Sequence, residues 1–455
     1  MSTSQLVILI LVLYMGAMLV LGRSARKRIK SVQDAIAAPG QSTMPLLVGS
    51  AVGTHIGSGF VVGGAEYGAR FGIGGAWYGI GCGISYLAVG LFISRFAYRN
   101  GFLSLSDYFS RRYQGKATRL IYSVATMLCC IAMLAGQLLA GRAIFLAVGI
   151  PEAWGVVLTA VISLCYATTS GLWGTMAASA LQSAVIFVGM LLALAVMLCS
   201  HGIPELVHSL PASCFDPIPF DSEFFVSMVV PTATVSLVSQ GIYQNISSAK
   251  SERAAVWGYL IGGLFLIPVA LIPPLLGMFG RALFPQAAPA EVFMALLLSR
   301  LPTAVAAVIL AAIICAVLGA CNSAYIVVAA NVVHDIYQGM IDPDASSQSC
   351  RRVLALVNAL VCVIGIFLAL RMNDIIQLLA LGYSLLTAGC LVPFAGGLLW
   401  KRGTAAGALA GSFVGMAASA GSSLGLFWLP YPSISAILLS ALAYVLVSLF
   451  KKQRQ

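Results

Sequence analysis

The stretch Gly53-Thr54-His55-Ile56-Gly57-Ser58-Gly59, followed by Gly63-Gly64, decides how this chain folds. It lies in an apolar run near 44–67 that is long enough to cross a bilayer as a helix. Each glycine weakens a helix by roughly 1 kcal/mol relative to alanine, and unwound backbone survives in lipid only beside protein or a wet cavity. Close packing through small residues explains the glycines but not the polar residues between them. We therefore expect a helix broken at mid-membrane beside a polar cavity.

Composition extends this reading to the whole chain of 455 residues. Hydrophobic residues make up 60% and charged residues only 9%, whereas soluble domains carry about 25% charged residues. Apolar runs long enough to span a bilayer recur along the sequence. The fold class we predict is an all-α polytopic membrane protein, with the lipid bilayer as its main solvent.

We predict thirteen transmembrane spans, and the basic residues fix their topology. The spans lie near 4–22, 44–67, 73–97, 118–148, 153–171, 175–200, 224–246, 255–279, 303–330, 353–371, 374–398, 404–425 and 433–450. With the N-terminus outside and the C-terminus cytoplasmic, 20 of the 25 Lys and Arg residues lie in inner loops, as the positive-inside rule requires. The net charge of +11 therefore reflects the topology of a plasma membrane protein, which in bacteria means the inner membrane. It does not indicate that the protein binds nucleic acid.

A second interrupted span begins at Pro231 and continues through Thr232, Thr234, Ser236, Ser239 and Gln240. It lies five spans after the first, and broken helices at matching positions of two halves indicate an inverted-repeat transporter. The parts we predict are a leading helix with its inner loop (1–42), a first five-helix repeat (43–200), an external loop (201–223), a second five-helix repeat (224–402), and two trailing helices with a cytoplasmic tail (403–455).

The external stretch 201–223 is expected to be an irregular surface loop, because it holds four prolines and no Lys or Arg. Cys199 and Cys214 flank it, and we expect them to remain unpaired. The other cysteines lie mostly in apolar spans without metal-ligand spacing, so we expect no metal beyond a sodium ion.

Several fragments, in order, resemble the sodium/solute symporter family. They are Thr54-His55-Ile56-Gly57-Ser58-Gly59, Gly75-Ala76-Trp77-Tyr78-Gly79, Leu105-Ser106-Asp107-Tyr108-Phe109, Gln244-Asn245-Ile246-Ser247-Ser248-Ala249-Lys250-Ser251, Asp335-Ile336-Tyr337 and Gly396-Gly397-Leu398-Leu399-Trp400. The resemblance implies a LeuT-like fold, with inverted five-helix repeats, one leading helix and two trailing helices. It also implies secondary active transport by alternating access, usually coupled to sodium.

The sequence departs from the family at the sodium site that the resemblance implies. The backbone ligands carry over to Thr54, Gly57 and Ala316. The hydroxyl pair carries over to Gly319 and Ala320, and a family aspartate to Ser179. A cation leaving water needs a nearly complete oxygen shell. Sodium-coupled transport therefore stays open beside the alternative of proton-coupled, exchange or uncoupled transport. Asn322 and Ser323 are candidates for a compensating ion site.

His55 is the titratable side chain that we place near the membrane centre, where ionisable residues are functional candidates. It is predicted to bind the solute or carry a coupled proton; a neutral, hydrogen-bonded histidine is the alternative. Helix ends at the breaks suit an anionic group, so the solute is predicted to be small, polar and organic, with a negative charge as one option. Predicted substrate-binding residues are His55, Ser58, Tyr78, Gln137, Gln240 and Gln377, of which Gln377 follows from the resemblance. Gating candidates are Trp77, Tyr243, Tyr325 and Tyr383.

Other classes fit less well. An intramembrane enzyme needs a cluster of acidic, His or Cys residues within the spans, and the sequence has no such constellation. A membrane-embedded solute sensor is the alternative from another class, but we find no soluble output domain in the sequence. We expect no cofactor, apart from sodium or a proton as coupling ion, and no obligatory protein partner.

Overall fold

The computed structural model describes residues 39–102, 105–147, 149–167 and 172–450, together with positions 5, 6, 8–10, 12, 13, 16 and 20. The predicted inner loop up to residue 38, and most of the leading span at 4–22, lie outside these residues. In the described part the regular structure is helical, apart from one isolated parallel bridge between Ser42 and Ala249. This agrees with the predicted all-α class.

Helices of the first half follow the predicted spans closely. Their bounds are α3 (Met44–His55), η1 (Ser58–Gly63), α4 (Gly64–Phe71), η2 (Gly72–Ala76), α5 (Trp77–Ala88), η3 (Val89–Ile93), α6 (Ser94–Asn100), α7 (Leu105–Tyr113), α8 (Lys116–Ala147), α9 (Glu152–Ala167), α10 (Leu172–Ser200), α11 (Gly202–Ser209) and η4 (Ala212–Phe215).

The second half is built in the same way. Its helices are α12 (Ser222–Thr234), η5 (Val235–Leu237), α13 (Gln240–Ser247), α14 (Glu252–Val269), α15 (Ile272–Leu283), α16 (Pro289–Arg300), α17 (Thr303–Ala329), η6 (Ala330–Ile341), α18 (Ser347–Arg371), α19 (Ile375–Leu399), α20 (Ala405–Ser423) and α21 (Pro432–Phe450). In the described part, nine helical segments are long and apolar enough to cross a membrane. The count of thirteen spans remains a prediction.

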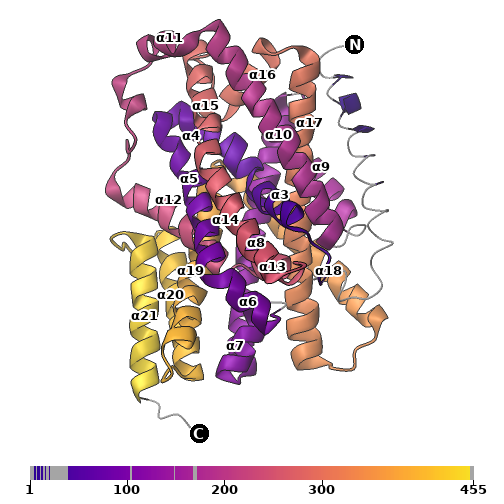
Figure 1. The fold of residues 1–455 in the computed structure, drawn as a ribbon, viewed down its shortest axis with the longest axis vertical. Coiled ribbons are helices and arrows are strands. Elements are labelled where there is room, and N and C mark those ends of the chain that lie inside the picture. Colours follow the sequence, from indigo (N-terminus) through magenta and orange to yellow (C-terminus); the bar gives the residue numbers. More distant parts are fainter. Residues whose placement is uncertain are drawn as a thin grey trace.

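The central helix is α8, which is 32 residues long and packs against α9, α17, α18 and α19. The last two helices, α20 and α21, pack on each other and flank α19 at one side of the bundle (Figure 1). One end of the bundle carries α11 and α16, and the opposite end carries α6 and α7 (Figure 1). We call these the α11 end and the α7 end.

Glycines let helices approach backbone to backbone at two places that shape the site. A Cβ at Gly53 of α3 would overlap the carbonyl oxygen of Ser179 in α10. A Cβ at Gly277 of α15 would overlap the carbonyl oxygen of Ala65 in α4. Lipid provides no hydrophobic force between helices, so such small-residue contacts hold membrane helices together.

The segment 201–223 differs from the predicted irregular loop. It contains the helix α11 and the short helix η4, because the prolines stand at the ends of these turns and leave Leu206 to be buried. Cys199 and Cys214 are both free thiols.

Candidate functional site

The first predicted break is confirmed. Helix α3 ends at His55, and Gly57 has φ −142° and ψ −145°, outside the helical region. The chain then resumes as the π-helix η1 and continues as α4. Two non-helical residues thus separate the half-helices, as the glycine density predicts.

The second predicted break is also confirmed. Helix α12 ends at Thr234, a single 3-10 turn follows, and Ser239 is extended with ψ 123° before α13 begins. Pro231 removes a backbone donor from the last turns of α12. The hydroxyl of Thr234 donates to the carbonyl oxygen of Val230 at 2.6 Å, which further weakens the regular ladder.

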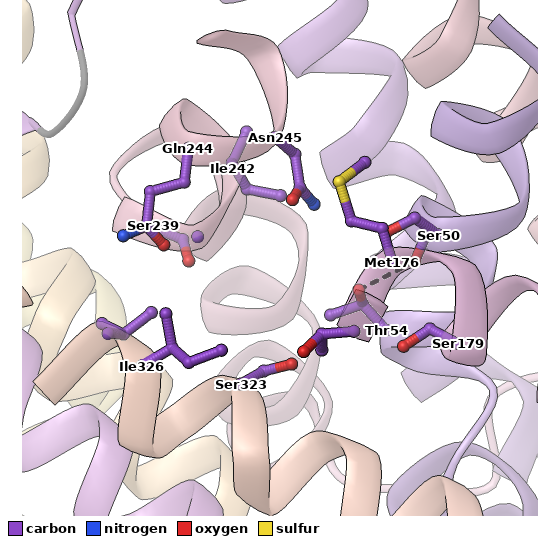
Figure 2. Close-up of a pocket in the computed structure, with 13 residues that line it drawn as sticks. Ser50, Thr54, Met176, Ser179, Ser239, Ile242, Gln244, Asn245, Ser323 and Ile326 are labelled. Atoms are coloured by element: carbon purple, nitrogen blue, oxygen red, sulfur yellow. Dashed lines mark hydrogen bonds between the residues drawn. The ribbon is translucent and has the colours of Figure 1, made fainter. Parts of the chain in front are cut away.

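A cavity of about 70 Å³ lies between the two interrupted helices, α10 and α17. By volume it has room for only a few water molecules. Its lining combines uncharged polar side chains with apolar ones (Figure 2). The lining residues are Ser50, Thr54, Thr175, Met176, Ser179, Ser239, Gly241, Ile242, Gln244, Asn245, Ser323, Ile326 and Val327.

Three hydroxyl residues from three helices meet at one end of this cavity: Thr54, Ser179 and Ser323 (Figure 2). Thr54 donates its proton to the carbonyl oxygen of Ser50 at 2.8 Å, and Ser323 donates to that of Gly319 at 3.1 Å. Because the protons are turned toward their own helices, the oxygen lone pairs are left for the cavity. This arrangement is suited to a hard cation, which prefers oxygen ligands.

Helix α13 carries amide side chains at the cavity and one turn away from it. Gln244 lines the cavity (Figure 2), and Gln240 precedes it by one helical turn. Within the described residues, Nε2 and Oε1 of Gln240 and Nε2 of Gln244 are buried without a hydrogen-bond partner. Leaving such a group unsatisfied costs about 1–3 kcal/mol, so α13 carries polar groups that its own packing does not use.

None of the predicted substrate-binding residues whose side chains the structure describes is a lining residue. The ring of His55 lies 4.7 Å from that of Tyr86. The Tyr78 hydroxyl lies 2.9 Å from where a Cβ of Gly59 would be, behind the first break. Gln137 is buried in α8, and Gln377 is exposed in the first turn of α19. Ser58 begins η1, but its side chain is outside what the structure describes.

The predicted ion positions divide into two groups. Thr54, Ser179 and Ser323 come together in the cavity. Asn322 instead donates from Nδ2 to the Thr175 hydroxyl at 2.8 Å. The remaining positions, Gly57, Ala316, Gly319 and Ala320, border the break or α17 without reaching the lining.

The aromatic gating candidates are packed into the bundle. Trp77 donates from Nε1 to the carbonyl oxygen of Pro217 at 2.7 Å and so holds the external segment. Tyr243 donates to the carbonyl oxygen of Leu237 at 2.9 Å, inside the second break. Tyr325 and Tyr383 are buried. Their gating role remains a prediction.

Sequence reasoning missed several lining residues, and helical spacing identifies them. Ser50 precedes Thr54 by four residues, and Thr175 precedes Ser179 by four. Gln244 follows Gln240 by four. Residues four apart share a helix face, so extending each predicted position by one turn would have found them.

Toward the α11 end, the partly exposed Arg70 forms ion pairs with two buried carboxylates. Arg70 of α4 lies 2.5 Å from Glu66 and 3.5 Å from Asp374. Asp374 also accepts a hydrogen bond from the Tyr67 hydroxyl at 3.3 Å and caps the start of α19. These contacts tie α4 to α19 on the far side of the break from the cavity.

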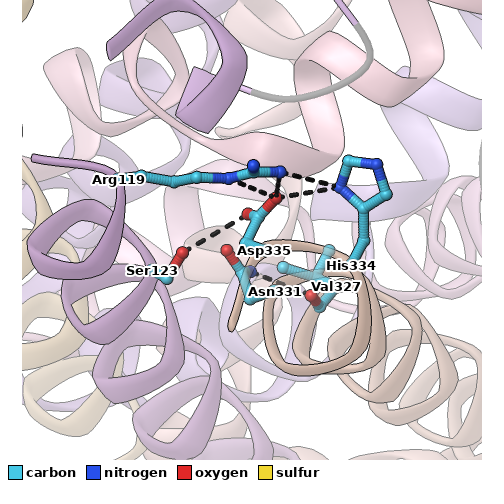
Figure 3. Close-up of polar contacts among 6 residues, drawn as sticks. All are labelled: Arg119, Ser123, Val327, Asn331, His334 and Asp335. Carbon is cyan, nitrogen blue, oxygen red and sulfur yellow. Dashed lines mark hydrogen bonds and ion pairs between the residues drawn. The ribbon is translucent and has the colours of Figure 1, made fainter. Parts of the chain in front are cut away.

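Toward the α7 end, a second polar cluster joins α8 to η6 (Figure 3). Arg119 lies 2.6 Å from Asp335, whose side chain is fully buried. Nδ1 of His334 is 3.0 Å from an oxygen of Asp335, and Ser123 donates to the other oxygen at 3.3 Å. Buried acids are thus paired near helix ends, and no acidic side chain is among the cavity-lining residues.

Comparison with known proteins agrees with this geometry. Residues 38–415 match the family model described as "Sodium:solute symporter family". The chain belongs to the sodium:solute symporter family. The resemblance predicted from the motifs is therefore confirmed, and this family member is a transporter and not an enzyme.

Two curated relatives of this symporter are sodium/pantothenate symporters. That of Escherichia coli (strain K12) is 25% identical over 385 residues, which cover 80% of this chain and 79% of the relative. That of Haemophilus influenzae (strain ATCC 51907 / DSM 11121 / KW20 / Rd) is 25% identical over 351 residues, which cover 73% and 72%.

Solved structures identify the fold of this symporter as LeuT-like. A Na+-coupled sialic acid symporter in a substrate-bound, outward-open state aligns with a TM-score of 0.80 at 18% identity, over 99% of both chains. Mhp1, a nucleobase-cation-symport-1 family transporter, in a closed conformation with bromovinylhydantoin bound, aligns with a TM-score of 0.54 at 14% identity, over 91% of this chain and 96% of that one.

Proposed function

We propose that this symporter couples the uptake of a small polar organic solute to sodium, with the cavity between α3, α10, α13 and α17 as the path. The observation that carries the proposal is the cavity itself, which is bounded by both broken helices and lined by uncharged residues, both polar and apolar. Broken helices at a bundle centre are where transporters of this architecture hold solute and ion.

Pantothenate is the solute to assay first. Both curated relatives are named for it, although 25% identity leaves the specificity of this chain to be measured. Pantothenate combines an amide, hydroxyls and a carboxylate, and the lining offers hydroxyl and amide partners for the first two. It is larger than the present cavity, so passage requires the helices to move, as alternating access provides.

Sodium binding is supported by the hydroxyl oxygens of Thr54, Ser179 and Ser323. All three hydroxyl groups line one end of the cavity (Figure 2). Thr54 also lies in the last turn of α3, where helix carbonyl oxygens have no intrahelical donor. No charged side chain is among the lining residues, so the site offers neutral ligands only. We infer a sodium ion bound more weakly than a carboxylate-containing site would bind it.

We infer that the structure is in the inward-facing state of the alternating-access cycle. The ion pairs of Arg70 with Glu66 and Asp374 tie α4 to α19 toward the α11 end. The side chain of Thr54 is exposed to solvent even though it lies beside the break in the first interrupted helix. If the basic α7 end is cytoplasmic, as the positive-inside distribution predicts, water reaches the ion site from the cytoplasm.

Removal of one ion ligand tests this proposal. In proteoliposomes, Ser323→Ala is expected to raise the sodium concentration for half-maximal [14C]pantothenate uptake about tenfold, because one oxygen interaction with a cation is worth about 1.5 kcal/mol. Ser419→Ala is the control, because its hydroxyl pairs with Ser384 between α19 and α20 at 2.9 Å, and it should leave the sodium dependence unchanged.

Proton coupling would be supported instead if uptake does not depend on sodium, is driven by a pH gradient, and is abolished in His55→Ala. If His55→Ala leaves both uptake and its pH profile unchanged, the solute or proton role predicted for His55 is wrong.

A further inference from the structure

We propose that Gln240 and Gln244 form a carboxamide pair that hydrogen-bonds an uncharged amide or hydroxyl group of the solute as it passes the cavity. The inference rests on the proposed transport function and deepens it, because it names the chemical class that α13 recognises. The two residues are one helical turn apart and therefore share a face of α13.

Gln244 belongs to the cavity wall, and Gln240 lies one helical turn before it, next to lining residues but not itself one of them. Gln244 lines the cavity (Figure 2), and the residues on either side of Gln240, Ser239 and Gly241, line it too. Each glutamine is only 1% exposed. Their amide groups are therefore removed from bulk water at the position where the second broken helix resumes.

The amide groups have unused hydrogen-bonding capacity. In the described part of the chain, both polar atoms of Gln240 and Nε2 of Gln244 have no partner. Buried amides without partners are unfavourable, and α13 does not need them, since its start is formed by backbone contacts such as Ile242 N to Ser239 O at 3.1 Å. A ligand that supplies both a donor and an acceptor would satisfy them.

The chemistry of the pair selects an uncharged group. A carboxamide offers two N–H donors and one carbonyl acceptor, and no charge. The residues that line the cavity include no Asp, Glu, Lys, Arg or His that would balance a charged group placed against α13. An amide or hydroxyl of the solute, which both donates and accepts, matches the pair, and any charged group of the solute must face elsewhere.

Thermal stability of the solute-free protein provides the first test. Gln240→Met and Gln244→Met keep the side-chain length and remove the polar atoms. If the amides are held for a ligand, the melting temperature of the purified full chain stays the same or rises, because unsatisfied groups are removed. A clear fall for both variants would show that the amides support the fold, and would overturn the proposal.

Uptake kinetics in proteoliposomes provide the second test. Each methionine variant should raise the KM for pantothenate about tenfold or more, and panthenol, the neutral alcohol analogue, should compete with pantothenate in the wild type. Asn358→Leu is the matched control, because it removes a buried amide of α18, away from the cavity, whose Oδ1 is likewise unpartnered in the described chain; it should leave KM unchanged. An unchanged KM in both methionine variants, or no competition by panthenol, would overturn the proposal.

These tests distinguish a failure of the proposal for the glutamine pair from a failure of the proposal that pantothenate is the solute. A wild-type protein that takes up no pantothenate would contradict the solute named above. The stability comparison would then still decide whether the two amides are held free of the protein's own hydrogen bonds.

Discussion

Replacing Asp335 with alanine is expected to destabilise the protein by about 3 kcal/mol, the lower end of the range for breaking a buried ion pair. The Asp335 side chain is fully buried, and it contacts Arg119 at 2.6 Å and His334 at 3.0 Å. Its loss leaves the largely buried Arg119 guanidinium without its counter-ion between α8 and η6 (Figure 3). Thermal unfolding in detergent measures the effect.

Glu252→Ala is the control for that change. Glu252 lies 2.9 Å from Arg95 and 2.7 Å from Arg99, and both arginine side chains are about two-thirds exposed. Exposed pairs contribute about 1 kcal/mol or less, so the melting temperature should fall at least three times further in Asp335→Ala. Equal shifts would contradict the structural role given to the Arg119–Asp335 pair.

Gly277→Ala is expected to separate α15 from α4 and to destabilise the protein by about 1–3 kcal/mol. The added Cβ would overlap the carbonyl oxygen of Ala65 in α4. A Cβ at Gly68 of α4 would likewise overlap the carbonyl oxygen of Pro274 in α15. Both contacts involve backbone atoms, so rotation of a side chain cannot relieve the overlap. Because α4 continues the first broken helix, we also expect slower uptake.

Gly262→Ala distinguishes this steric effect from the general effect of removing a glycine. A Cβ at Gly262 of α14 would meet its nearest neighbour, Cβ of Ala51, at 3.6 Å, which is an ordinary contact. Alanine favours a helix over glycine by about 1 kcal/mol, so this variant should be as stable as the wild type or more stable. A similar loss in both variants would refute the close-packing argument.

Both helix breaks could be predicted because local chemistry determines them. Glycine at 53, 57 and 59 and proline at 231 weaken the backbone ladder wherever the helix packs. Motif order then indicated the family, and with it the arrangement of the two broken helices. These signals are carried by the sequence and need no knowledge of neighbouring elements.

The face of α3 that borders the cavity could not be predicted in the same way. His55 and Thr54 are adjacent in sequence, but the structure turns His55 toward Tyr86 and Thr54 toward Ser323 and Ser179. In an apolar helix without an amphipathic stripe, the hydrophobic pattern does not say which face meets the cavity. The packing of α3 against α10 and α14, together with the contact of Tyr86 from α5, decides it.

The external segment illustrates a different limit. Proline-rich composition predicted an irregular loop over 201–223, yet α11 forms over eight residues there. Short helices of this kind depend on tertiary contacts, in this case on burial of Leu206, because isolated helices of that length are unstable in water.

Thiol labelling tests the central claim, that the cavity between α3, α10, α13 and α17 is a water-accessible path from one side of the membrane. The experiment places cysteine at Ile326, a lining residue, in a chain whose exposed Cys165 and Cys199 are serine. A membrane-impermeant maleimide should label Ile326→Cys from the side that carries Lys250, and should not label Ala312→Cys, a fully buried position of α17. Equal protection of both cysteines from both sides would contradict the account.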